Sequence, residues 1–142
     1  DPFVEAAFTA GPVDLAVGSV LYSYDFFEMP GSVYELYGSA GFGPLSAAYY
    51  YTPSQENLDD AVYWLEVGAG TTVLGADVSA SLGLGTYSDW TYMSEAESVT
   101  TLLLSAGKSV TDDLSVSWNY TLDLSDDDDL GNIFFMTASW GF

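Results

Sequence analysis

The fold is decided by the stretch LSVSWNYTLDL at residues 114–124, in which large apolar side chains alternate with small or polar ones. Successive side chains of a β-strand point to opposite faces, so this period of two predicts a strand with one apolar and one polar face. The same alternation occurs at 33–42, 61–73 and 77–87. We therefore expect a protein built almost entirely of β-strands.

Nine strands are predicted in this way, and helix is nearly absent. Most of them are about ten residues long, which is enough to cross the hydrocarbon of a bilayer at a tilt of roughly 45°. A strand of a soluble protein is shorter, at about five to six residues. The predicted strands cover 3–11, 13–25, 32–43, 45–53, 61–73, 76–88, 98–110, 114–125 and 132–142.

The connections between these strands alternate in length. Short turns are predicted at Gly11-Pro12, Gly43-Pro44, Leu74-Gly75 and Thr111–Asp113, and longer polar loops at 26–31, 53–60, 89–97 and 125–132. Aromatic residues gather near the strand ends, as at Tyr22 and at 49–51. An outer-membrane barrel has short turns on one rim, long loops on the other and aromatic girdles at both interfaces. The expected fold is all-β: an antiparallel up-and-down transmembrane β-barrel, formed by residues 1–142 as a single domain.

Composition excludes several classes of function. The 142-residue chain has no Cys and no His, so it lacks thiol chemistry and the commonest general base and metal ligand, and we expect no enzyme. Its single basic residue stands against 21 acidic ones, a net charge of −20, and one cation is too few to bind nucleic-acid phosphates. Salt screens the self-repulsion of such an acidic protein, which suggests a salt-rich habitat.

One part of the chain carries a family resemblance. The stretch VYELYGSAGFGPLS at 33–46, the YYYTP at 49–53 and the YWLEVG at 63–68 resemble segments of the TorF-type putative porin family of proteobacterial outer-membrane proteins. The resemblance implies a porin-like barrel with a poorly defined solute and no catalytic residues. Members of that family are longer at the beginning, and bacterial barrels have an even number of strands. We therefore expect 1–142 to be the C-terminal part of a twelve-stranded barrel.

The face opposite the large apolar side chains carries the candidate site. Inside a barrel, carboxylates at one height form a negative ring that favours cations. Glu35 and Glu66, both in mid-strand and two strands apart, are the best pair for such a constriction. The alternative is a solvated lining without a selective role. The candidate lumen residues are Glu5, Asp14, Glu35, Glu66, Asp77 and Asp123.

Three further features suggest ligands or partners. The run Asp126, Asp127, Asp128 and Asp129 offers oxygen ligands for Ca²⁺, with a hydrated surface loop as the alternative, and no other cofactor is expected. The last strand ends in Trp140 and Phe142, which resembles the signal read by the barrel-assembly machinery, although many β-proteins end in an aromatic residue. Lys108 lies near a short turn, where lipid headgroups, Asp112 or Asp113 are its candidate partners.

The sequence therefore predicts a bacterial outer-membrane porin for passive passage of small solutes, leaning towards cations. Its expected partners are the lipid bilayer, the assembly machinery, and further copies of the chain or another membrane protein. Two alternatives stay open. One is a structural outer-membrane protein that packs with partner proteins, and the other is a soluble extracellular β-sandwich or filament subunit.

Overall fold

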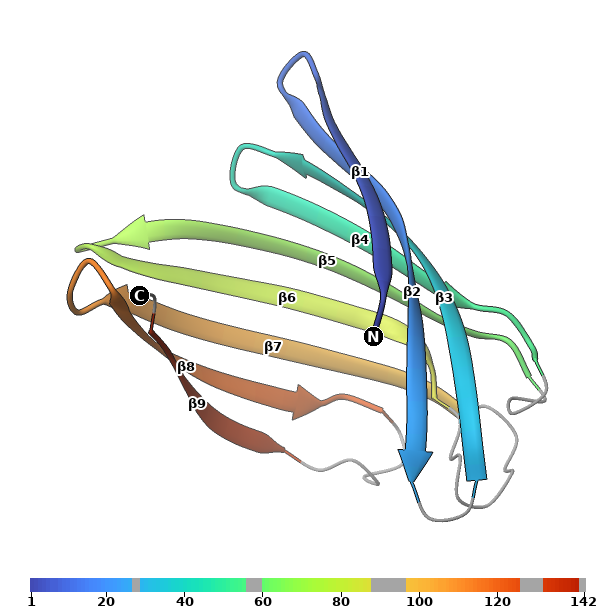
Figure 1. Ribbon diagram of the computed structural model, residues 1–142. Helices are drawn as coiled ribbons and strands as arrows, with labels where there is room; N and C mark the ends of the chain where they lie inside the picture. The colour runs from blue at the N-terminus through green and yellow to red at the C-terminus, as the bar shows by residue number, and fades with distance from the viewer. Residues whose placement is uncertain (27–28, 56–59, 88–96, 126–131, 141–142) are drawn as a thin grey trace.

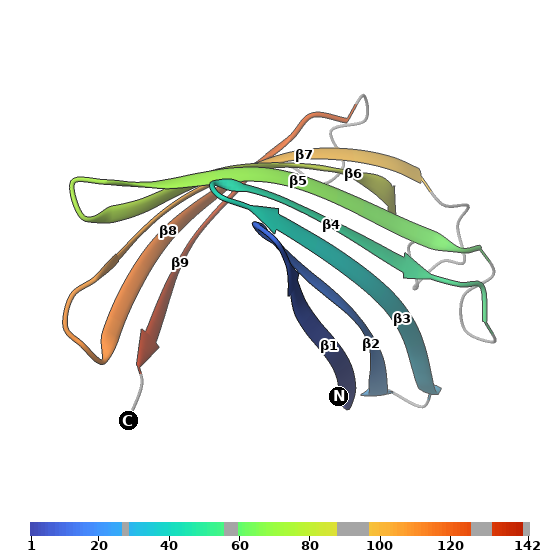
Figure 2. The ribbon, with the colours of Figure 1, turned by 90° about the horizontal axis from the view of Figure 1, so that it is seen from above.

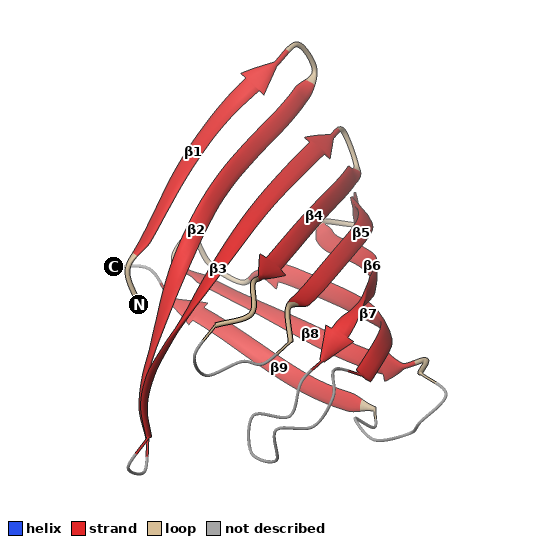
Figure 3. Cartoon of the chain, turned by 90° about the vertical axis from the view of Figure 1, so that its right-hand side faces the viewer, coloured by secondary structure: helices blue, strands red, loops and turns tan. Residues whose placement is uncertain are grey.

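The computed structural model describes residues 1–26, 29–55, 60–87, 97–125 and 132–140. They form one antiparallel sheet in which each strand pairs with its sequence neighbours, in the order β1 to β9 (Figures 1 and 3). These residues contain no helical segment with the length and hydropathy of a membrane span. The strands are β1 (Phe3–Ala10), β2 (Val13–Phe26), β3 (Met29–Phe42), β4 (Leu45–Thr52), β5 (Val62–Val73), β6 (Ala76–Tyr87), β7 (Glu97–Ser109), β8 (Leu114–Asp123) and β9 (Ile133–Trp140).

The sheet curls into an arch. Seen from above, β1–β3 form one limb and β8–β9 the other, and the two limbs face each other across an open side (Figure 2). No pairing joins β1 to β9 among the described residues. The predicted antiparallel, all-β architecture with nine strands is thus confirmed, and the sheet itself is open.

Short turns join the strands at one rim, and three of the four contain a glycine with positive φ. Gly11 and Gly43, each followed by proline, have φ of 62° and 56°, which suits the first central position of a type II′ turn. Leu74 and Gly75 have φ of 53° and 76°, as a type I′ turn requires. The fourth connection closes when the backbone N–H of Val110 donates to the Leu114 carbonyl, at 2.7 Å. All four predicted short turns are therefore confirmed.

The predicted long loop at 26–31 is wrong. The β2–β3 ladder continues to the pair Phe26–Met29 and leaves only residues 27–28 between the strands. Both backbone groups of Tyr34 bond to the Gln55 side chain, on the side of β3 that faces away from β2. Pro30 has the same parity as Tyr34, so its missing N–H lies on that outer side, where no strand pairs with β3 before Leu36. Proline there does not interrupt the hairpin.

The register divides the side chains between two faces. One face, which we call the apolar face, joins Ala40, Ala47, Val67, Leu82, Leu102 and Leu122 through successive cross-strand pairs. Among the side chains that the structure describes, no carboxylate lies on the apolar face, and Lys108 is its one charged group. The opposite, polar face carries glycine, serine, threonine and carboxylates.

The polar face is the inner side of the arch. Every described residue that is buried lies on this face, as expected where side chains converge on a concave surface; these residues are Val33, Thr52, Gly83, Gly85 and Val99. Glycines make room for large rings there. The Trp64 ring of β5 lies over Gly83 and Gly85 of β6, and the Tyr37 ring of β3 lies over Gly18 of β2.

Replacing Gly83 by alanine tests this packing. The new methyl group would overlap the Trp64 ring, so we expect a loss of about 1–3 kcal/mol in the free energy of unfolding, measured by urea titration. Gly41→Ala is the matched control on the same face, because its nearest neighbours would lie at 4.0 Å. Equal effects of the two substitutions would show that Trp64 does not need the space.

Leu74 offers a test of the turn. A leucine with φ of 53° is strained, whereas asparagine tolerates this left-handed conformation. We expect Leu74→Asn to raise the free energy of unfolding by about 1 kcal/mol. Leu74→Ala keeps the Cβ atom that causes the strain and should change the value little. A stabilisation by alanine equal to that by asparagine would contradict this explanation.

Candidate functional site

All six predicted lumen carboxylates lie on the polar face of the sheet. The register places Glu5 opposite Gly18, Glu66 opposite Gly83 and Asp123 opposite Thr101, all within this face. Asp14 pairs with Thr9, Asp77 with Thr72, and Glu35 with Val20. The period of two was therefore sufficient to group these residues correctly.

Three of the six carboxylates make local bonds near the ends of strands. Asp14 accepts a hydrogen bond of 2.9 Å from the Thr9 hydroxyl across the first turn. Asp77 accepts one of 2.7 Å from Thr72 across the third. The Asp123 carboxylate accepts the backbone N–H of Ser125 at 2.9 Å, at the opposite rim. These three support the ends of hairpins and stand apart from mid-strand.

The other three carboxylates lie with tyrosines in what we call the Tyr–Glu cluster: Glu5, Glu35, Glu66, Tyr22, Tyr37 and Tyr50. The Tyr37 hydroxyl reaches across Gly18 of β2 and donates to Glu5 Oε2 at 2.7 Å. The Tyr22 hydroxyl donates to Glu35 Oε1 at 3.2 Å. The rings of Tyr37 and Tyr50 are tilted by 30° to each other with their centroids 6.1 Å apart.

The predicted pair Glu35 and Glu66 lies on the polar face of β3 and β5, two strands apart as expected. Tyr50 pairs with Tyr37 on one side and with Trp64 on the other. Glu35 lies two residues before Tyr37 and Glu66 two residues after Trp64, so the two carboxylates occupy diagonal positions on either side of Tyr50. The arrangement is an acidic and aromatic strip along β1–β5.

The remaining part of the polar face, on β6–β9, carries many small side chains, together with Asp77 and Asp123 near strand ends and larger apolar residues such as Leu103 and Phe135. The Ser105 hydroxyl donates to the Asn119 carbonyl oxygen at 2.8 Å, and the Asn119 amide donates to Ser117 at 3.3 Å. The concave surface is therefore chemically uneven. Its carboxylates and large rings are concentrated on one limb and the neighbouring crest of the arch.

The sequence did not reveal the role of Tyr22, which was grouped with the aromatic residues at strand ends. Its parity on β2 is that of Asp14 and Val20, which lie on the polar face. The even spacing from Asp14 to Tyr22 in the sequence could therefore have placed Tyr22 on the face of the carboxylates. The bond from Tyr37 to Glu5 could not be found in the same way, because it joins strands that are two positions apart in the sheet.

The remaining predicted site residues receive less support. Asp126–Asp129 and Phe142 lie outside the described residues. Within the described ranges, no three acidic side chains come together in a group that could hold a metal ion. Trp140 lies on the apolar face, 71% exposed, opposite Leu114 at the short-turn rim, and its role in assembly stays a prediction.

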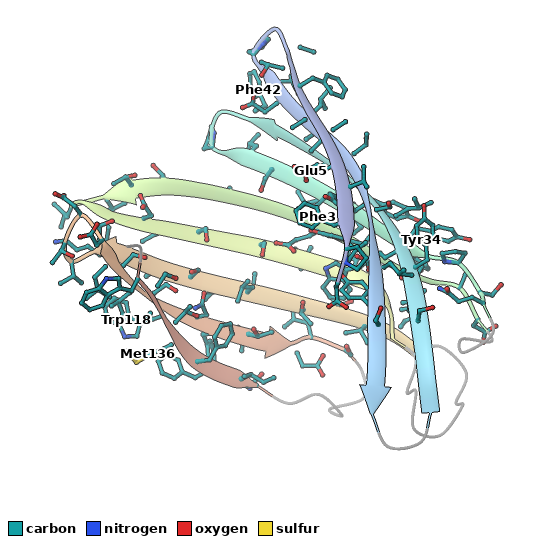
Figure 4. All side chains as sticks on the ribbon, viewed as in Figure 1. Phe3, Glu5, Tyr34, Phe42, Trp118 and Met136 are labelled. Atoms are coloured by element: carbon teal, nitrogen blue, oxygen red, sulfur yellow. The ribbon has the colours of Figure 1, made fainter. Side chains whose placement is uncertain are left out.

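Most exposed aromatic residues of the apolar face lie towards one rim or the other, with Tyr120 between them opposite Leu104; Figure 4 labels Tyr34, Phe42 and Trp118 among them. Tyr34 and Phe42 lie on the same face of β3, eight residues apart, which corresponds to roughly 26 Å along the strand. At a barrel-like tilt of roughly 35–45° this spacing covers about 19–21 Å of height, somewhat less than the band of about 25 Å that an outer-membrane barrel presents to lipid. Phe8, Phe42, Trp118 and Trp140 lie towards the short turns, and Tyr34, Tyr49, Tyr51, Tyr63 and Phe134 lie towards the other rim.

The chain matches no protein-family model, and its comparison with curated proteins and with solved structures gives no significant match. The resemblance to TorF-type porins therefore stays a prediction.

The bond between Tyr37 and Glu5 can be tested separately from the packing of the ring. Tyr37→Phe removes the hydroxyl but keeps the ring over Gly18, so we expect a loss of about 1 kcal/mol in the free energy of unfolding. Tyr37→Ala should cost more, because the ring is lost as well. Glu5→Gln retains an acceptor oxygen and serves as the control. Equal losses for phenylalanine and alanine would show that the ring contributes nothing.

Proposed function

We propose that this chain forms the wall of a transmembrane β-barrel in a bacterial outer membrane and passes small solutes, with a preference for cations. The observation that carries this proposal is the separation of the two faces. The outer face of the arch is apolar, and the six carboxylates line its inner face.

The exposure of the apolar face favours lipid over water as its surroundings. Leu36, Val67 and Leu104 are 42%, 50% and 40% exposed in the middle of their strands. Apart from Ser19 opposite Leu36, the residues paired with them on this face are Tyr51, Ala47, Leu82, Ala80 and Tyr120, so the exposed residues form a continuous surface and are not scattered singly. Soluble proteins rarely leave such a surface uncovered, whereas a lipid bilayer covers it at no cost.

A closed barrel in which every pair is antiparallel requires more than these nine strands. Strands that differ by an even number run in the same direction, so β1 and β9 are parallel to each other. Direct closure would join them as a parallel pair, unlike every other pair in the sheet. In a bilayer their free backbone groups must also be paired. An odd number of additional antiparallel strands satisfies both requirements, and three of them complete the twelve-stranded barrel expected from the TorF-type resemblance.

The inner face supplies the electrostatic preference. It carries carboxylates and no basic side chain within the described residues, so its potential attracts cations and repels anions. The Tyr–Glu cluster also places bulky rings beside the charges, which narrows the passage on that limb. Glu66 is half-buried in mid-strand and is the best single candidate for selectivity.

Planar-bilayer recordings under a KCl gradient test the proposal. We expect the protein to conduct and its reversal potential to give a cation-to-anion permeability ratio above one. Glu66→Gln should lower this ratio by up to about fivefold, as expected for an interaction of about 1 kcal/mol. Asp60→Asn removes the same charge outside the strands and should leave the ratio nearly unchanged.

Three other outcomes would each contradict a part of the proposal. A protein that inserts without conducting would contradict the transport function and favour a structural outer-membrane role. A monomer that stays soluble without detergent would contradict the membrane location itself. Equal ratios for the wild type and Glu66→Gln would remove the selectivity assignment.

A further inference from the structure

Lys108 is the only basic side chain of the sequence, and the sheet places it on the face that is free of described carboxylates. Its partner across β7 and β8 is Val116, which in turn pairs with Ala138 on β9. Lys108 is exposed and lies one residue before the end of β7 at Ser109. The cation therefore stands at the short-turn edge of the apolar face.

Two tryptophans of the same face flank this position. Trp118 pairs with Ala106, and Trp140 pairs with Leu114, so each lies diagonally from the Lys108–Val116 pair. They are 44% and 71% exposed. Tryptophan prefers the boundary between lipid and water, and a lysine near that boundary extends its ammonium group to the headgroups.

Acidic side chains stand just beyond the strand, at the tip of the next turn. The backbone N–H groups of Val110 and Thr111 bond to the Leu114 carbonyl, and the Thr111 hydroxyl accepts the N–H of Asp113 at 3.3 Å. Asp112 and Asp113 are exposed at this tip. Among the described residues, no ion pair joins Lys108 to a carboxylate. The edge thus presents one positive group on the apolar face, without an ion-pair partner among the described residues, and two exposed carboxylates in the turn that follows β7.

We propose that this edge binds the headgroup of a zwitterionic phospholipid of the phosphoethanolamine class. The proposal rests on the membrane location proposed above. The Lys108 ammonium binds the phosphate, Asp112 and Asp113 bind the ethanolamine ammonium, and Trp118 and Trp140 pack against the glycerol region. Charge complementarity selects this lipid, because an anionic headgroup without an amine would meet the two carboxylates unpaired.

Native mass spectrometry of the protein extracted from mixed vesicles tests the proposal. The vesicles contain equal amounts of phosphatidylethanolamine and phosphatidylglycerol in a phosphatidylcholine background. We expect the ethanolamine lipid to be enriched on the wild-type protein. Lys108→Gln should reduce its bound fraction about fivefold, the effect of one interfacial lysine. Ser98→Gln, on the same face at the far end of β7, should leave it unchanged.

A second variant separates the two halves of the headgroup. The double substitution Asp112→Asn and Asp113→Asn should shift the preference towards phosphatidylglycerol. An unchanged preference in this variant would overturn the ethanolamine contact, and an unchanged bound fraction in Lys108→Gln would overturn the phosphate contact.

Insertion is measured first, by protection of the strands from protease in the vesicles. Failure to insert contradicts the proposed function and the lipid site together. Insertion with equal binding of all three lipids contradicts the lipid site alone. Enriched ethanolamine lipid on a protein that conducts no ions supports the site while contradicting transport.

Discussion

The structure depends on one constraint: the alternation of side chains along each strand must stay in step with its neighbours across the whole sheet. A slip of one residue would move an entire strand's apolar side chains to the concave side and its carboxylates to the convex side. Two-residue turns prevent such a slip. The Leu74-Gly75 turn pairs Val73 with Ala76, and this pairing places Glu66 and Asp77 on the same face. The chemistry of the turns therefore determines the chemistry of both surfaces.

Curvature depends on the same alternation, since residues of the concave face must fit a smaller area. Glycines at 83 and 85 leave room for the Trp64 ring, and Gly18 leaves room for Tyr37. Each ring then covers backbone that a larger residue would have covered with its own side chain. Because the Tyr37 ring crosses β2, its hydroxyl meets Glu5 of β1. The packing that permits the bend thus also brings tyrosines and carboxylates together.

Sequence reasoning succeeded where the determining interactions are local. The strands, the four glycine-containing or polar short turns and the face of each carboxylate all follow from neighbouring residues. It failed at 26–31, where composition suggested a loop. Whether Pro30 breaks a ladder depends on which side of β3 its missing N–H would face, and this side is known only once the pairing is known. The positions of Glu35 and Glu66 around Tyr50 likewise require the register of three strands.

The high negative charge is compatible with the proposed membrane location because the described acidic side chains lie away from the apolar face. Strand carboxylates with described side chains lie on the concave face, and further acidic residues such as Asp60 and Asp112 lie in connections beyond the strands. A carboxylate on the apolar face would have to enter lipid, at a cost of up to a few kcal/mol. The one basic residue occupies the edge of that face, where its ammonium can reach water. Self-repulsion acts mainly among groups that remain hydrated, so counterions can reduce it without entering the bilayer. A chain with this charge is therefore suited to a barrel wall, because its described strand carboxylates all lie on the face opposite the apolar one.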